Sequence, residues 1–144
     1  KSVDSIHKEL GHVMWEYVGM GRTAEGLKEG LKRLKEIRKE FEKELFIPGE
    51  KEGMNVELDK AIRLYDFITM GELIAYDALN RNESCGGHFR EEYQTEEGEA
   101  KRDDENFFYV ACWEYQGSDD KAPVLYKEPL VYEAIKVQTR NYKS

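Results

Sequence analysis

The sequence has little cysteine and proline, no long apolar run and no excess of basic residues. Its two cysteines are too few for a disulfide framework, which indicates a reducing compartment. No stretch approaches the roughly 20 apolar residues of a membrane span, and the first residues show no signal-peptide pattern. The net charge of -8 argues against nucleic acid or an anionic membrane surface as a main partner.

The 144 residues suit a single domain, 1–144, with a core of its own. Hydrophobic residues make up 40% of the chain and charged residues 36%, which predicts a folded protein with a strongly charged surface. The sequence begins with Lys1 rather than Met, as a processed protein or a domain of a longer protein would.

Three segments, about 3–18, 23–46 and 56–80, have the apolar period of helices. Ser2 or Asp4 can cap the first, and Thr23 can open the second. Apolar residues of the second segment recur every three or four positions, and the remainder of that segment is Lys, Arg and Glu. The third segment has apolar residues on more than one side, so we expect it to be the central helix of the bundle. Its predicted buried stripe is Leu58, Ile62, Tyr65, Ile68, Leu73, Tyr76 and Leu79.

After residue 93 the composition changes from helical to loop and strand patterns. Residues 94–106 are acidic and polar, as in an exposed loop, and Phe107–Tyr115 is aromatic and β-branched, as in a strand. A turn and Val124–Lys127 complete a hairpin of about 107–128, and Ala134–Val137 is a further strand candidate. The predicted fold is mainly α: an antiparallel three-helix bundle, spectrin-repeat-like, followed by a small β-hairpin and an extended tail.

The segment 82–93 is the most distinctive part of the chain, because it combines glycines with histidine, arginine and carboxylates directly after a helix. Glycine permits backbone conformations closed to other residues. His88 and Arg90 carry donors that can bind a carboxylate or the backbone of another domain. We predict an ordered polar docking turn. The alternative is a structural turn in which Arg90 binds a local carboxylate such as Glu83.

Patterns for catalysis or cofactor binding are missing. His7 and His12 are five residues apart, whereas a zinc-binding helix needs a spacing of four. There is no phosphate loop and no Gly-x-Gly-x-x-Gly. Cys85 and His88 lack an evident third, orienting group, and Cys112 fits a small buried hydrophobe. We therefore assign no catalytic, cofactor-binding or metal-binding residue to this chain.

Two motifs resemble a known family. Glu83–Glu92 resembles the pattern Glu-Ser-Arg-Gly-(Ala/Gly)-His-x-Arg-x-(Asp/Glu), and Arg102–Phe107 resembles Arg-Asp-Asp-x-Asn-(Phe/Trp). Together with the Val-Gly-x-x-Arg turn at Val18–Arg22, they resemble the C-terminal helical domain of succinate dehydrogenase and fumarate reductase flavoprotein subunits. Cys85 departs from the pattern, which has arginine at this position. L-aspartate oxidases share the helical domain and part of the turn and are the nearest competitor.

The resemblance implies a parent protein that interconverts succinate and fumarate through FAD. The FAD would lie in a missing N-terminal region and not in this chain, which alone would not be catalytic. Electrons would pass to or from an iron–sulfur subunit and a membrane quinone. This soluble domain would pack against the FAD-binding and capping domains and the iron–sulfur subunit, on the cytoplasmic side of a bacterial inner membrane. The candidate docking residues are Glu83, Ser84, His88, Arg90, Arg102 and Asp103.

Two readings from other classes stay open at this point. A free-standing acidic helical module could bind a protein partner through its aromatic hairpin, and a contiguous exposed apolar patch would favour it. A cysteine-dependent enzyme would need a depressed pKa at Cys85.

Overall fold

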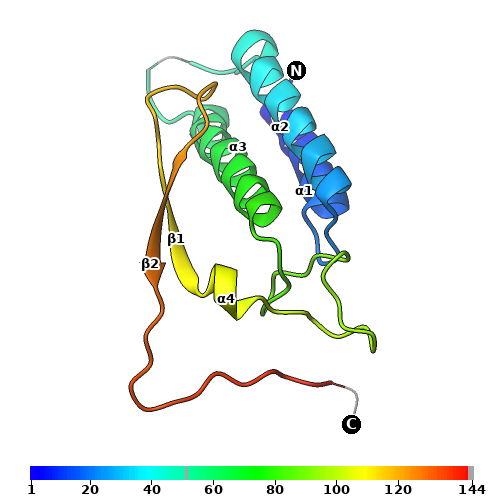
Figure 1. Cartoon of the computed structure of the whole chain (residues 1–144). Coiled ribbons are helices and arrows are strands. Elements are labelled where there is room, and N and C mark those ends of the chain that lie inside the picture. The colour runs from blue at the N-terminus through cyan, green and yellow to red at the C-terminus, as the bar shows by residue number, and fades with distance from the viewer. Residues whose placement is uncertain (51, 143–144) are drawn as a thin grey trace.

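The computed structural model describes residues 1–50 and 52–142 and contains a bundle of three long helices (Figure 1). These are α1 (Val3–Tyr17), α2 (Ala24–Glu44) and α3 (Val56–Asn80). A polar side chain caps the start of each helix by accepting a backbone N–H from the first turn. The caps are Ser2, Thr23 and Asn55. The prediction of a mainly α, three-helix bundle followed by a hairpin is confirmed.

The core lies along the axis of the bundle and takes side chains from all three helices. Ile6 of α1, Leu34 of α2 and Leu64 of α3 are completely buried and belong to the same hydrophobic cluster. A methyl group on Gly30 would lie 2.9 Å from Cβ of Tyr17, so the close approach of α1 and α2 requires glycine there. Burial of aliphatic side chains is the main stabilising contribution to such a bundle.

The buried face of α3 differs from the predicted stripe. Leu58, Ile62 and Tyr65 are exposed, and the helix buries a stripe that includes several small residues. Its members are Ala61, Leu64, Ile68, Gly71, Ala75 and Ala78. Small side chains let α3 approach its neighbours closely. The prediction failed because apolar residues lie around most of the circumference of α3, so the spacing of apolar residues does not identify one buried face. The prediction that α3 is central is also wrong, because α2 has the most extensive contacts with both other helices.

The hairpin lies beside α3 (Figure 1) and consists of β1 (Tyr109–Glu114) and β2 (Val124–Pro129), paired antiparallel. It is preceded by the short helix α4 (Asp104–Phe107), which the sequence did not predict; Asp103 caps α4, and the strand therefore begins at Tyr109. Trp113 packs edge-to-face on Tyr76 of α3, with ring centroids 5.1 Å apart. Its indole N–H donates to Asp77 at 2.8 Å, which fixes the hairpin against the helix.

Alternate residues of β1 face the bundle and the solvent, as in any strand covered on one side. Cys112 is on the solvent side and is exposed, so its predicted burial is wrong. The predicted strand at Ala134–Val137 is also wrong: within the described residues this segment pairs with no other strand. The tail instead runs as an extended ribbon past the lower end of the molecule in Figure 1. Among the described residues, no helix is both long and apolar enough to cross a membrane.

Candidate docking site

The predicted docking turn lies at the C-terminal end of α3, where distant parts of the chain meet. We call this region the arginine hub, after the guanidinium groups of Arg22, Arg81 and Arg90 that hold it together. Backbone hydrogen bonds join its segments: Arg22 N–H donates to the carbonyl of Phe89 at 3.0 Å, and Glu91 N–H donates to the carbonyl of Arg22 at 2.8 Å. The loop between α1 and α2 is thereby paired with the turn.

The tip of the turn is a tight reversal at Cys85–His88. The backbone N–H of each end residue donates to the carbonyl of the other, at 2.8 and 3.0 Å. Gly86, between them, has φ of +59°, a conformation that favours glycine. Cys85, Gly86 and Gly87 are exposed at this tip. The two glycines noted in the sequence therefore form an ordered turn that faces the solvent.

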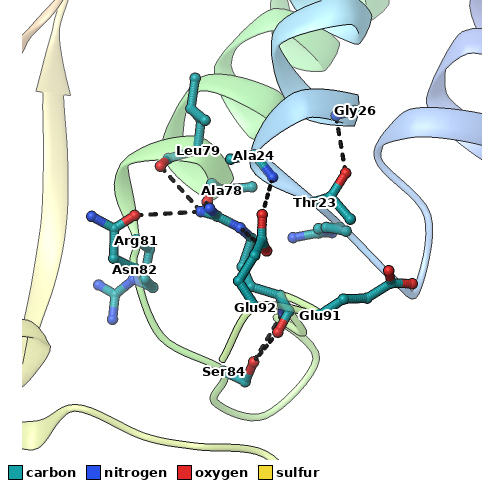
Figure 2. Close-up of polar contacts among 12 residues, drawn as sticks. Thr23, Ala24, Gly26, Ala78, Leu79, Arg81, Asn82, Ser84, Glu91 and Glu92 are labelled. Carbon is teal, nitrogen blue, oxygen red and sulfur yellow. Dashed lines mark hydrogen bonds and ion pairs between the residues drawn. The ribbon is translucent and has the colours of Figure 1, made fainter. Parts of the chain in front are cut away.

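Arg90 is buried and binds the end of α3. Its Nη1 donates to the carbonyls of Ala78 and Leu79 at 3.1 and 3.2 Å, groups that the end of a helix leaves without intrahelical partners. Figure 2 shows Leu79 and Asn82 converging on this group. The backbone N–H of Arg90 donates to Ser84 Oγ at 2.9 Å, and the Ser84 hydroxyl donates back to the Arg90 carbonyl. Arg90 therefore caps α3 and closes the turn.

Glu92 joins this cap to the start of α2. One of its carboxylate oxygens accepts from Arg90 Nε at 3.2 Å, and the other accepts from the backbone N–H of Ala24 (Figure 2). Thr23 caps the same helix end through Gly26 N–H at 3.0 Å. Although burial raises the pKa of Glu92, the hydrogen bonds from Ala24 and Arg90 outweigh it and hold that pKa below its usual range. A carboxylate at a helix N-terminus is also stabilised by the helix dipole.

Arg81 connects the turn to the start of the hairpin. Its guanidinium donates to the carbonyls of Phe107 and Tyr109 at 3.0 and 3.1 Å and to the carboxylate of Glu83 at 2.9 Å. The second oxygen of Glu83 accepts the backbone N–H of Asp103 at 2.8 Å. The alternative in which Arg90 binds a local carboxylate is confirmed, but the carboxylate is that of Glu92, because Glu83 binds Arg81.

His88 lies between two of the arginines and is half-buried. Its Nδ1 is 3.1 Å from Nη1 of Arg22, which can only donate, so Nδ1 accepts and the proton is on Nε2. Nε2–H then donates to the carbonyl of Arg81 at 2.9 Å. Burial lowers the pKa of His88, and the charges of Arg22 and Arg90 lower it further. The ring is thus a neutral bridge between the α1–α2 loop and the end of α3.

Arg102 lies at the outer side of the hub. Its guanidinium binds Asp104 through two hydrogen bonds of 2.7 Å and donates to the carbonyl of Gln138 at 3.0 Å. Close by, burial raises the pKa of the Cys85 thiol, and the charge of Glu83 raises it further. This is the opposite of what an activated cysteine nucleophile needs, so the cysteine-dependent enzyme is not supported.

The predicted docking residues all belong to the hub, but they differ in exposure. Glu83, Ser84 and Arg90 are buried and bind their own chain, so they shape the turn without being available to a partner. His88, Arg102 and Asp103 are partly exposed. Arg81 and Glu92 were not among the predicted docking residues. Arg22 was named only within the Val-Gly-x-x-Arg turn, which is the local signal for it.

Comparison with known proteins matches almost the whole chain to one family. Residues 7–142 match the family described as "Fumarate reductase flavoprotein C-term". The chain belongs to this family. The motifs that carried the sequence resemblance are those that build the arginine hub of this flavoprotein C-terminal domain.

Relatives of this flavoprotein domain include fumarate reductase subunits and L-aspartate oxidases. The chain is 34% identical to the fumarate reductase flavoprotein subunit of a Serratia species, over 71% of this chain and 16% of the relative. It is 35% identical to L-aspartate oxidase 2-b of Nicotiana tabacum, over 61% of this chain and 13% of the relative. A solved structure described as quinol-fumarate reductase with menaquinol molecules matches 94% of this chain and 22% of its own, with a TM-score of 0.77 and 26% identity. The chain thus spans under a fifth of these curated relatives.

Proposed function

We propose that this chain is the C-terminal structural domain of a flavoprotein that interconverts succinate and fumarate. The observation that carries the proposal is the family match over residues 7–142, which includes the whole arginine hub. In the whole protein, FAD would be bound outside these residues and would supply the hydride chemistry. The chain itself would be non-catalytic.

The role of the domain would be to pack against the FAD-binding and capping domains of the same polypeptide. The hub supports this role, because it rigidly presents an exposed polar tip at Cys85–Gly87 together with the partly exposed His88 and Arg102. Buried Glu83, Ser84 and Arg90 would act indirectly by holding that tip in place. An iron–sulfur subunit and a membrane quinone would exchange electrons with the flavin, on the cytoplasmic side of a bacterial inner membrane.

The second candidate is L-aspartate oxidation, which the similarity to the Nicotiana enzyme favours. Both candidates use a flavin and oxidise a four-carbon dicarboxylate, so the present domain could serve either one. Arg90 and the Arg102–Phe107 motif, which carry the sequence resemblance, favour the succinate/fumarate assignment.

The test is to purify the full-length gene product and assay it with an artificial electron acceptor. We expect bound FAD and electron transfer from succinate but not from L-aspartate. Activity with L-aspartate alone would overturn the succinate assignment in favour of the second candidate. A gene product that consists of this domain alone and contains no flavin would instead indicate the free-standing interaction module.

The domain's share of this function can be tested separately. In the full-length protein, Gly87→Val would place bulk at the exposed tip without occupying the positive-φ position of Gly86. We expect lower flavin retention or weaker subunit assembly if the tip docks. Unchanged flavin content and assembly would overturn a docking role for the tip.

A further inference from the structure

The tail beyond the hairpin has the sequence of a strand, but the part of the chain that the structure describes provides no partner strand for it. Leu130 N–H donates to the carbonyl of Phe108 at 3.2 Å. Beyond it the chain bends at residues 133–134, then runs without regular secondary structure, and it is exposed up to residue 142. Ile135 is 66% exposed and Val137 is 40% exposed, although both are β-branched residues typical of covered strands. Within the described residues, no backbone hydrogen bond involves residues 131–137.

The tail is nevertheless held in place at several points. Tyr132 packs on Phe108 with ring centroids 5.8 Å apart, Arg102 Nη1 donates to the carbonyl of Gln138, and the N–H of Tyr142 donates to a carboxylate oxygen of Glu99 at 3.3 Å. These contacts lie on both sides of residues 133–137. The domain therefore holds this segment in a defined position while the backbone groups of residues 133–137 remain available for hydrogen bonding.

The bond to Arg102 also fixes which backbone groups are free. In an extended chain the N–H and C=O of one residue point to the same edge, and those of the next residue point to the opposite edge. Because the carbonyl of Gln138 points toward Arg102 of its own domain, Lys136 shares that inward edge. The backbone groups of Ile135 and Val137 then point outward, away from Arg102.

We propose that residues 134–138 add as a strand to a sheet edge in the remainder of the same polypeptide, pairing through the outward backbone groups of Ile135 and Val137. This rests on the proposed function, in which the rest of the protein is a flavin-binding fold. The curated relatives are six or more times longer than their matched segment, so most of such a protein is available as the partner. Strand addition supplies main-chain hydrogen bonds, and the apolar Ile135 and Val137 side chains gain cover.

Hydrogen exchange in the full-length, flavin-containing protein tests the pairing. The amides of Ile135 and Val137 should exchange at least about tenfold more slowly than that of Lys136, because only they would be in a ladder. In the 144-residue chain alone, all three should exchange rapidly. Rapid exchange of Ile135 and Val137 in the flavin-containing protein would overturn the inference and leave the proposed function standing. Absent flavin would instead count against the proposed function.

A matched pair of proline variants sharpens the test. Val137→Pro removes an outward N–H, whereas Lys136→Pro removes an inward one. We expect Val137→Pro to abolish the protection of Ile135 and Lys136→Pro to retain more of it. Equal loss in both variants would overturn the assigned edge. Protection that depends on protein concentration would assign the pairing to a second copy, and would overturn the intramolecular partner.

Discussion

The helical bundle and the arginine hub are stabilised in different ways. The bundle buries aliphatic side chains such as Leu34 and Leu64, and contacts of this kind are non-directional and tolerate replacement by side chains of similar volume. The hub instead depends on guanidinium groups that donate to particular carbonyls and carboxylates. Such bonds depend on direction as well as distance. The bundle therefore provides stability, and the hub determines how the loop, turn and hairpin are arranged on it.

The largest expected effect is in the bundle. Leu34→Ala removes a completely buried side chain, and we expect it to lower the free energy of unfolding by about 2–5 kcal/mol. The control is Leu58→Ala, because Leu58 was predicted to be buried but is exposed. This substitution should change the free energy of unfolding by less than about 0.5 kcal/mol. Denaturant unfolding of the 144-residue chain measures both. Similar losses in the two variants would contradict the observed burial of α3.

Arg90→Met should have the largest effect in the hub. It leaves the carbonyls of Ala78 and Leu79 without their donor, and we expect a loss of about 2–3 kcal/mol in the same measurement. The control is Arg63→Met, which breaks an exposed pair with Asp59 and should cost less than about 0.5 kcal/mol. Equally small losses from both substitutions would show that Arg90 does not stabilise the end of α3.

A smaller effect should appear as a pH dependence of the hub. His88 has a folded-state pKa below its usual 6.5, so the unfolded chain binds its proton first as the pH falls. This contribution is fully present above pH 6.5 and is lost as the pH falls from 6.5 to the lower folded-state pKa. Thermal unfolding between pH 8 and 5 should show this decrease, and His88→Gln should reduce it. The exposed His12 provides the control, since His12→Gln should leave the decrease in place.

The smallest effect is expected at Cys85. Cys85 is exposed, but partial burial of its thiol and the charge of Glu83 raise the thiol pKa. We therefore expect slow alkylation by iodoacetamide at pH 7. Cys85→Ser should leave the activity of the full-length protein near normal. Loss of turnover with intact flavin would show that the thiol has a role that its surroundings do not predict.

The sequence by itself determined the elements with strong local signals. The helices are defined by apolar period and by capping residues such as Thr23, which act within a few residues of one another. The two hub motifs were also recognisable, because their glycine, arginine and carboxylate residues are close together in the chain. Local interactions of this kind can be read without knowledge of the fold.

Only the tertiary structure decided which residues those elements bring together. The buried stripe of α3 depended on the fit of small side chains against α1 and α2, because apolar residues cover most of that helix. The tertiary structure decided which local carboxylate Arg90 binds. Glu83 is taken by Arg81 and by the distant N–H of Asp103, so Arg90 pairs with Glu92. For Ala134–Val137, the sequence provides the β-branched pattern of a strand, but a strand also requires a neighbour, and no local signal supplies one.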